Sequence, residues 1–281
     1  MSADISAIDR TTDPPCKLCG GPTFLKFSRS LLDGRFEASY FECRACEMLQ
    51  SRHLDVAAPE IVSEIYSQGT RHDVGAAWRQ WCIAERLWQL ARLRVARRRD
   101  RPMRALDLGA GSGFCVGFMQ YRLGWNAYGY DLFATPSFAP DRFLPDWDSV
   151  LNAGPFDFIL ASEVFEHFCD PAREITQIAG VLNPDGGLMF VTTERFKPHL
   201  HDAEWTYLAP QSGQHVAFYS PATFSEIARR IGDAGWTSLA TESEWLIYRN
   251  ANRRKMLPYH IAAGAAALSL GAKIGLIHRI V

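Results

Sequence analysis

Four of the seven cysteines stand in two pairs that have the spacing of metal ligands. Cys16 and Cys19 form one Cys-x-x-Cys pair, and Cys43 and Cys46 form the other. Four thiolates placed in this way can surround one Zn²⁺ tetrahedrally, and four sulfur ligands leave no open position for a reacting water. The spacing therefore predicts a structural zinc site, with two unrelated cysteine pairs or labile disulfides as the alternative.

A second chemical motif lies near the middle of the chain, where a short apolar run is followed by glycines. The run Ala105–Leu108 has the character of a strand, and Gly109, Gly111 and Gly113 follow it at alternate positions. Glycines at such a turn allow a ligand to approach main-chain atoms closely. The dinucleotide-binding fingerprint needs a small residue at position 114, where this chain has Phe114, so the loop differs from that of a dehydrogenase.

Two aspartates flank this loop and indicate the kind of ligand. Asp107 lies in the strand just before the glycines, where its negative charge suits a cationic amino-acid ligand and would repel a pyrophosphate. Asp131 ends the next apolar run, 18 residues after Gly113. Nucleotide-binding α/β folds place a carboxylate at that position, where it accepts the hydroxyl protons of a ribose. An ordinary turn aspartate is the alternative interpretation of Asp131.

Two histidines are the candidate proton acceptors, because an unperturbed imidazole pKa of about 6.5 suits proton transfer near neutrality. His167 follows the fourth predicted strand, and His215 lies in the long segment 194–218 after the fifth. A connection of that length in a compact domain is usually functional. We favour His215 as base or substrate ligand, and His167 is the second candidate, with a loop-orienting role as its alternative. The same segment contains a possible metal pair: His199, His201 and Asp202.

The elements that must position these groups follow from the apolar periodicity. Between residues 104 and 234, short apolar runs alternate with stretches of helical spacing, which predicts a doubly wound α/β fold with a parallel sheet. Ligands of such sheets bind beyond the carboxyl ends of the strands. Residues 59–101 are also predicted to be helical. Their arginine-dense end is expected to be a solvated helix terminus, with contact to an anionic substrate or membrane as the alternative.

Composition narrows the class of protein. The chain has 281 residues, of which 22% are charged, and its formal net charge is -1. Proteins that bind nucleic acid over a broad surface usually carry a clear basic excess, so nucleic acid is not the expected partner. The first 15 residues lack the basic and apolar stretches of a secretory signal, and three scattered cysteines suit a reducing compartment. We therefore expect a cytoplasmic protein.

The C-terminal end of the chain is mostly apolar. Its uninterrupted apolar part, Ile261–Ala272, is too short to cross a bilayer, which needs about 20 residues. We expect this part to pack on protein, and peripheral membrane contact through residues 256–281 is the alternative. Four segments are thus expected along the chain: a disordered lead (1–15), a zinc ribbon (16–55), an α/β domain (56–250) and an apolar helix or tail (251–281).

Several segments in this order carry a family resemblance. The segments LDLGAGSGF, GYD, FDFILASEVFEHFCDP and LNPDGGLMFVTT resemble the class I S-adenosylmethionine-dependent methyltransferases over residues 104–240. The resemblance implies a Rossmann-like sheet of seven strands and an S-adenosylmethionine pocket. The region before the fourth strand departs from the family pattern, which leaves Asp146 or Trp147 for the adenine. The remaining cofactor contacts implied by the resemblance are Gly109, Gly111, Gly113, Asp131, Ser162 and Glu163.

Two further resemblances bear on the acceptor. The Glu-x-x-Glu-His pattern at residues 163–167 resembles the branch of the family that methylates oxygen or carbon of small molecules. The cysteine segment resembles the zinc-binding N-terminal module of some bacterial sugar C-methyltransferases, which implies a substrate-side lid or docking piece. The primary hypothesis is methyl transfer to a small-molecule or glycan acceptor. The alternatives are an RNA methyltransferase that binds RNA through the zinc ribbon and the arginine-rich helix, and a non-catalytic cofactor-binding scaffold attached to a membrane by its tail.

Overall fold

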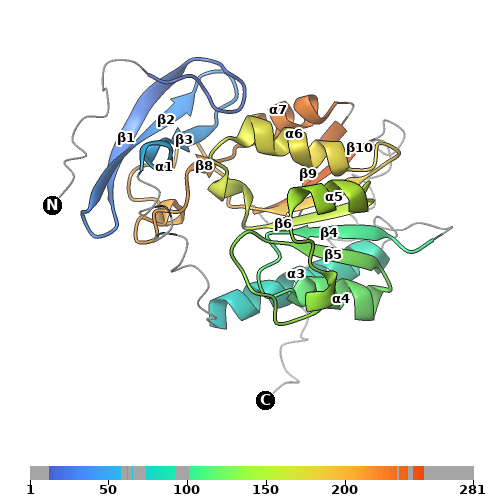
Figure 1. Cartoon of the computed structure of the whole chain (residues 1–281). Helices are drawn as coiled ribbons and strands as arrows, with labels where there is room; N and C mark the ends of the chain where they lie inside the picture. The colour runs from blue at the N-terminus through green and yellow to red at the C-terminus, as the bar shows by residue number, and fades with distance from the viewer. Residues whose placement is uncertain are drawn as a thin grey trace, which may run out of the picture. The chain divides into compact units, whose positions relative to one another are not determined.

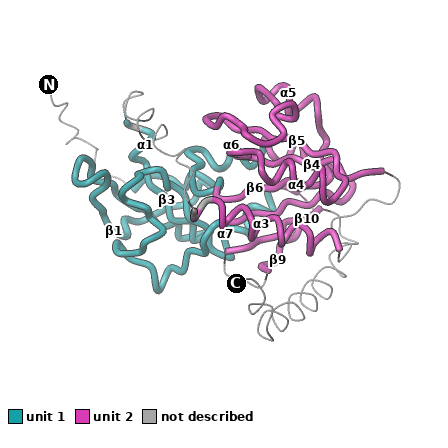
Figure 2. The backbone as a smooth tube through the Cα atoms, turned by 90° about the horizontal axis from the view of Figure 1, so that it is seen from below, with its two compact units in different colours: residues 1–71, 164–176, 193–230 teal, residues 72–163, 177–192, 231–281 magenta. Residues whose placement is uncertain are grey.

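The computed structural model describes residues 13–57, 62, 65, 74–92, 101–232, 234–239 and 243–249. These residues form two compact units, each assembled from separate segments of the chain (Figures 1 and 2). The predicted tail and residues 1–12 of the predicted lead lie outside the described residues. Unit 1 contains residues 1–71, 164–176 and 193–230, and unit 2 contains residues 72–163, 177–192 and 231–281.

Unit 2 is built on a six-stranded, mostly parallel sheet in the order β5-β4-β6-β7-β10-β9 (Figure 1). Strands β4 to β7 are parallel, and β10 and β9 extend the sheet antiparallel at one edge. Strand β7 is buried along its whole length, as expected for a parallel strand covered on both faces. The predicted α/β class is confirmed. The strands are β4 (Arg104–Leu108), β5 (Asn126–Tyr130), β6 (Phe158–Ser162), β7 (Leu188–Thr192), β9 (Ala234–Ser238) and β10 (Glu244–Arg249).

The family resemblance implied seven strands, and the sheet in the described part of the chain has six. Between β5 and β6 the chain forms η1 (Pro140–Arg142) and α5 (Trp147–Ala153), and it meets β5 through a parallel bridge between Gly129 and Phe143. Leu144 donates its N–H to the carbonyl of Gly129 at 2.8 Å. Beyond this bridge, the described residues show no further pairing of the segment with β5.

Helices α3 (Val74–Arg92) and α4 (Phe114–Leu123) cover one face of this sheet, and α5 lies on the other (Figure 1). The buried face of α3 carries Ile83, Leu87 and Leu90, which share one apolar core with strand residues such as Phe158 and Phe190. Apolar side chains at this spacing fall on one stripe of a helix, so their burial fixes the orientation of α3. No helix among the described residues is long and apolar enough to cross a bilayer.

Unit 1 contains a four-stranded antiparallel sheet in the order β1-β2-β3-β8. Strand β8 comes from much later in the chain and pairs with β3 through Leu49 and Phe218. Both residues belong to a buried core together with Tyr40, Phe196 and Leu208. The elements of this unit are β1 (Thr23–Leu31), β2 (Phe36–Cys43), β3 (Leu49–Ser51), α1 (His53–Val56), η2 (Phe165–His167), η3 (Thr206–Leu208), β8 (Ala217–Phe218), α7 (Pro221–Ile231, whose last residue falls in unit 2) and the first half of α6 (Pro171–Val181).

The start of α7 is capped by the side chains of Ser220 and Thr223. Thr223 donates its N–H to the Ser220 hydroxyl at 3.2 Å, and Ser220 donates its N–H to the Thr223 hydroxyl at 3.1 Å. This reciprocal arrangement satisfies amides that have no partner within the helix. Pro221 is tolerated at the first helical position because its missing N–H is not needed there.

Candidate functional site

The loop after β4 turns through three glycines in the left-handed region of backbone space. Gly109, Gly111 and Gly113 have φ values of 69°, 50° and 81°. Other residues are strained in this region, so the backbone path itself requires glycine. Gly113 is the N-cap of α4, so the loop leads directly into the N-terminus of that helix.

The space around the loop differs between its two later glycines. A Cβ atom on Gly113 would lie 2.2 Å from the carbonyl oxygen of Phe138 and 2.9 Å from Cε2 of Phe143. A Cβ atom on Gly111 would meet no atom of the described residues within 4 Å. Gly113 is thus needed for packing within the protein, and Gly111 is the point where a ligand can approach the main chain.

Asp131, which is predicted to meet a ribose, also holds this loop in place. Its Oδ2 atom accepts a hydrogen bond from the N–H of Gly111 at 2.9 Å, and its Oδ1 atom accepts the N–H groups of Phe133 and Ala134, each at 2.8 Å. A carboxylate has about four lone-pair positions, so these bonds leave capacity for about one more. The structure adds a positioning role, and the ribose contact stays a prediction.

The Asp107 carboxyl is buried and has a raised pKa. Its side chain lies in β4 and the residue is 4% exposed. Burial, and secondly the charge of Asp131, raise the pKa of the Asp107 carboxyl to about 8. A positive group beside it would favour the carboxylate form and lower that pKa. The contact of Asp107 with a cationic ligand stays a prediction.

One contact of the loop was not anticipated from the sequence. Gln80 of α3 donates from its side-chain amide to the Ser112 hydroxyl at 3.0 Å. The carbonyl of Ser112 accepts the N–H groups of Ser137 and Phe138, both at 2.9 Å. The glycine loop is therefore fixed from α3 as well as from the segment after β5. A lone glutamine on a helix carries no sequence signal for such a contact.

The end of β6 brings the predicted residues Ser162 and Glu163 against the end of β7. The Ser162 hydroxyl lies 3.0 Å from that of Thr192, and Thr192 donates to Glu163 Oε1 at 3.0 Å. Glu163 has a φ of 54°, which is strained for a residue with a side chain. Strain of this kind clusters at functional positions, and the cofactor contact of these two residues stays a prediction.

The two residues suggested for the adenine lie at the start of α5. Asp146 is the N-cap and accepts the N–H of Ser149 at 2.7 Å. The Trp147 ring packs edge-on against Tyr130, with ring centroids 5.7 Å apart. Asp146 therefore has a structural task that explains its presence, and Trp147 is the better placed of the two to present an aromatic face.

In unit 1, both candidate histidines belong to one cluster with Glu166 and Tyr207. Tyr207 donates its hydroxyl to Glu166 Oε1 at 2.6 Å, and the His167 and His215 rings lie 5.0 Å apart. One ligand atom from each of Glu166, His167 and His215 can be chosen so that all three lie within 4.8 Å of one another. The two histidines that the sequence selected are thus brought together, and Glu166 and Tyr207 are additional members.

The backbone fixes the tautomers of these histidines. His215 Nδ1 lies 2.6 Å from the carbonyl oxygen of Tyr207, and His167 Nδ1 lies 3.2 Å from that of Gln214. A carbonyl only accepts, so each Nδ1 atom carries the proton and each Nε2 atom carries the lone pair.

Burial keeps both rings neutral. It lowers the pKa of His167, and burial together with His167 lowers the pKa of His215 to about 4. The cluster therefore presents lone pairs beside a buried carboxylate, a donor set that can take up a proton or hold a divalent cation.

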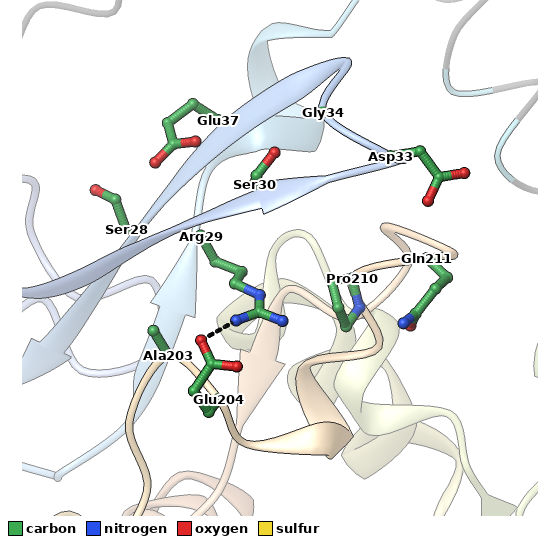
Figure 3. A pocket seen from close by; sticks show the side chains of 10 residues that line it. All are labelled: Ser28, Arg29, Ser30, Asp33, Gly34, Glu37, Ala203, Glu204, Pro210 and Gln211. Carbon is green, nitrogen blue, oxygen red and sulfur yellow. Dashed lines mark hydrogen bonds and ion pairs between the residues drawn. The ribbon is translucent and has the colours of Figure 1, made fainter.

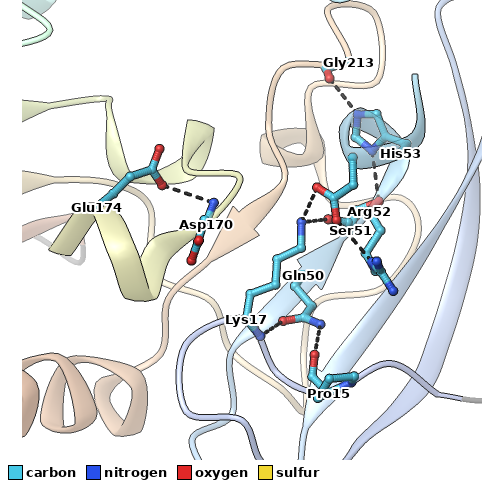
Figure 4. Close-up of polar contacts among 10 residues, drawn as sticks. Pro15, Lys17, Gln50, Ser51, Arg52, His53, Asp170, Glu174 and Gly213 are labelled. Carbon is cyan, nitrogen blue, oxygen red and sulfur yellow. Dashed lines mark hydrogen bonds and ion pairs between the residues drawn. The ribbon is translucent and has the colours of Figure 1, made fainter. Parts of the chain in front are cut away.

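The segment that carries His215 is held from several sides within unit 1. His53 Nε2 lies 2.7 Å from the Gly213 carbonyl, and the other ring nitrogen lies 2.9 Å from the Ser51 hydroxyl (Figure 4). Ser51 also donates its N–H to Val216. Lys17, next to the first cysteine, donates to the Ser51 carbonyl at 3.0 Å (Figure 4). These bonds connect the cysteine segment to the loop of the histidine cluster.

His199, His201 and Asp202, the suggested metal ligands, do not form a group that could hold a metal ion in the part of the chain that the structure describes. His201 stacks on Trp205 with ring centroids 4.0 Å apart, and its Nδ1 atom accepts the N–H of Lys197 at 3.3 Å. Asp202 accepts the N–H of Glu204 at 2.9 Å. These contacts give His201 and Asp202 roles in shaping the loop.

The same loop borders a polar cavity of about 430 Å³ next to the β1–β2 hairpin (Figure 3). Arg29 forms an ion pair with Glu204 across it. The cavity has no aromatic wall, and its lining is Ser28, Arg29, Ser30, Asp33, Gly34, Glu37, Ala203, Glu204, Pro210 and Gln211.

The four cysteines of the two pairs converge in unit 1. The sulfur atoms of Cys16 and Cys46 lie 3.6 Å apart, those of Cys19 and Cys43 lie 3.5 Å apart, and all four fall within 4.8 Å of one another. Disulfide sulfurs lie about 2.05 Å apart, so these are thiols. Burial raises the pKa of the Cys19 thiol to about 11. The arrangement is compatible with one tetrahedral metal ion.

Comparison with known proteins gives a family. A family model described as a methyltransferase domain matches residues 79–236. The chain is 50% identical over 42 residues to the ubiquinone biosynthesis O-methyltransferase of Caulobacter vibrioides, a stretch that is 15% of this chain and 16% of that protein. The match to this curated relative thus spans less than one fifth of its length.

Solved structures are similar at low identity. The plantazolicin methyltransferase BpumL in complex with SAH is 14% identical, with a TM-score of 0.44 over 68% of this chain and 90% of that chain. A SAM-dependent methyltransferase from Archaeoglobus fulgidus is also 14% identical, with a TM-score of 0.44 over 60% of this chain and 93% of that chain.

The two later glycines of the loop should respond differently to alanine. Gly113→Ala combines a strained φ with a steric overlap, and we expect it to lower the free energy of unfolding by about 3 kcal/mol. Gly111→Ala adds strain without overlap and should cost about 1–2 kcal/mol. Urea denaturation of both variants measures the difference. Equal losses would contradict the contrast in space around the two positions.

Proposed function

The chain belongs to the methyltransferase domain family, and on that premise we propose that it transfers a methyl group from S-adenosylmethionine to a small-molecule or glycan acceptor. The observation that carries the proposal is the buried Asp107 carboxyl at the foot of a glycine loop that is open at Gly111. The Caulobacter relative is named as an O-methyltransferase, which is in keeping with a hydroxyl acceptor.

The residues of the loop fit a sulfonium nucleoside. Gly109 and Gly111 would hold it by main-chain contact, and Asp107 would compensate the positive charge of its amino-acid part. The remaining lone pair of Asp131 would accept one ribose hydroxyl. Ser162 and Glu163 would lie beside the cofactor, and Asp146 or Trp147 would contact the adenine.

S-adenosylmethionine supplies, when bound, an electrophilic methyl group. The protein has to align the acceptor and remove its proton. We assign proton removal to Nε2 of His215, with His167 as the second candidate. The Tyr207 carbonyl holds the His215 tautomer, and the Glu166 carboxylate would stabilise the imidazolium that forms.

A second role for the same cluster is supported by the low pKa of His215. A pKa of about 4 keeps the imidazole neutral at physiological pH but makes it a weak base. Two neutral imidazoles and a carboxylate are a common donor set for divalent cations. A cation held by Glu166, His167 and His215 would polarise an acceptor oxygen and ease its deprotonation.

We also propose a structural Zn²⁺ on Cys16, Cys19, Cys43 and Cys46. Zinc–sulfur bonds of about 2.3 Å in a tetrahedron separate the sulfur atoms by about 3.8 Å, close to the spacings of the two cysteine contacts. The carbonyl of Cys46 accepts a hydrogen bond from the Thr223 hydroxyl at 2.8 Å.

Cofactor binding should release a proton. At pH 7 the Asp107 carboxyl, with a pKa near 8, is mostly protonated, and a cationic ligand lowers that pKa. Affinity should therefore rise as the pH increases toward 8. Calorimetric titration with S-adenosylmethionine in two buffers of different ionisation enthalpy measures the proton count. Asp107→Asn should abolish the buffer dependence and weaken binding about tenfold or more, whereas the exposed Asp185→Asn should change neither. Absence of any binding would overturn the proposed function.

His215→Gln should lower kcat by about 100-fold or more and leave cofactor affinity unchanged, because it removes the proton acceptor. The assay is S-adenosylhomocysteine release with the best acceptor from a panel of phenols and sugar derivatives. His201→Gln, in the same loop, is the matched control and should keep kcat within about threefold. Cofactor binding without turnover on any acceptor would favour the non-catalytic alternative.

A titration with Mn²⁺ followed by electron paramagnetic resonance separates the two roles of the cluster. Binding of Mn²⁺ to the full-length protein that disappears in His215→Gln assigns the cluster to a cation. If Mn²⁺ does not bind, the cluster is assigned to proton removal instead.

Removal of one cysteine ligand should remove the zinc. Cys43→Ser should lower the zinc content from about one ion per chain to near zero and destabilise the module, because small zinc modules depend on the metal to fold. Cys82→Ser, at an exposed position of α3, is the control and should retain the ion. Mass spectrometry of the metal measures both. Full zinc occupancy in Cys43→Ser would contradict the four-cysteine site.

A further inference from the structure

Helix α3 has an aromatic outer face opposite its buried one. Trp78, Trp81 and Trp88 are 66%, 52% and 40% exposed, while Ile83 and Leu87 are buried in the core of unit 2. Trp81 and Trp88 are seven residues apart and therefore share one stripe of the helix. Large indoles are rarely exposed in numbers on one helix unless the surface has a partner.

Positive charge accompanies this face. Arg92 lies over the Trp88 ring at 4.6 Å and is itself exposed, as is Arg79. Along the sequence, residues 79–104 hold nine arginines against two acidic residues, in a chain whose net charge is -1. Among the arginines of this stretch that the structure describes, Arg86 forms an ion pair with Glu244 and Arg101 forms one with Asp157. The remaining excess marks this region as complementary to an anionic surface.

The combination of indoles with arginine suits one anionic partner best. Tryptophan is amphipathic and settles at the boundary between lipid headgroups and acyl chains, and arginine beside it meets the phosphates of anionic lipids. A helix that lies in this boundary needs one apolar face and a basic flank, and it needs no bilayer-spanning length. A nucleic acid would also attract arginine, but the near-neutral charge of the whole chain argues against a broad nucleic-acid surface.

We propose that the outer face of α3, defined by Trp78, Trp81, Trp88 and Arg92, binds the surface of an anionic lipid bilayer. This contact goes beyond the proposed methyl transfer and does not depend on it. It is carried by a helix of the folded domain, so it differs from an attachment through residues 256–281. Its consequence is that acceptors dissolved in or attached to a membrane become accessible to the enzyme at that surface.

The test is co-sedimentation of the full-length protein with vesicles of phosphatidylcholine and with vesicles that contain 30% phosphatidylglycerol. We expect binding to the anionic vesicles that weakens in 0.5 M salt, and little binding to the neutral ones. The double variant Trp81→Ala/Trp88→Ala should bind at least about tenfold more weakly. Tyr121→Ala, which removes another exposed aromatic residue, should bind as the unchanged protein does.

Two further measurements distinguish binding through α3 from loss of binding by misfolding and from binding through the tail. Quenching of the intrinsic tryptophan emission by brominated phosphatidylglycerol in the unchanged protein reports indole insertion without any substitution. Deletion of residues 251–281 should leave vesicle binding within about threefold. The proposal is overturned by anionic vesicle binding that disappears with the tail and ignores the tryptophan pair, by absence of vesicle binding, or by binding of a labelled uridine 20-mer in its place.

Discussion

The Asp131 carboxylate accepts hydrogen bonds from three backbone amides, and these bonds join the loop after β4 to the loop after β5. A loop with three left-handed residues is conformationally free unless its surroundings determine it, and this carboxylate does so from one side while Gln80 does so from the other. The same negative charge also helps to keep the Asp107 carboxyl protonated. One residue thus sets the shape of the glycine loop and contributes to its electrostatics.

Much of this architecture could be predicted from the sequence because it has a local cause. The strands ALDL, NAYGY, FILAS and LMFVT and the helices between them carry strong periodicity, and glycine is dictated by the backbone at Gly111 and Gly113. Strands β9 and β10 were not located in the sequence, because a short strand gives a weaker periodic pattern than a helix. Nor was it anticipated that, in the part of the chain that the structure describes, the segment around Phe143 meets β5 through a single bridge.

The sequence predicted which residues belong to the candidate site, but it did not predict which of them contact one another. The Glu-x-x-Glu-His pattern selected His167, and the long loop selected His215, yet their proximity depends on how residues 207–216 fold back. That path is fixed by hydrogen bonds to main-chain carbonyls, which any residue can supply and which leave no trace in the sequence. Glu166 was present in the quoted pattern, and only its burial beside both rings distinguishes it from a surface glutamate.

The pairing of β8 with β3 has a consequence for how such a chain can evolve. Strand β2, which ends at Cys43, belongs to a sheet that is completed by β8 with Phe218, a residue far from the cysteines in the sequence. A recombination event that moved the first 55 residues to another gene would leave that sheet without its fourth strand and would expose the apolar residues around Leu49. The cysteine segment and the histidine-bearing connection therefore depend on each other to complete one sheet, although they are far apart in the sequence.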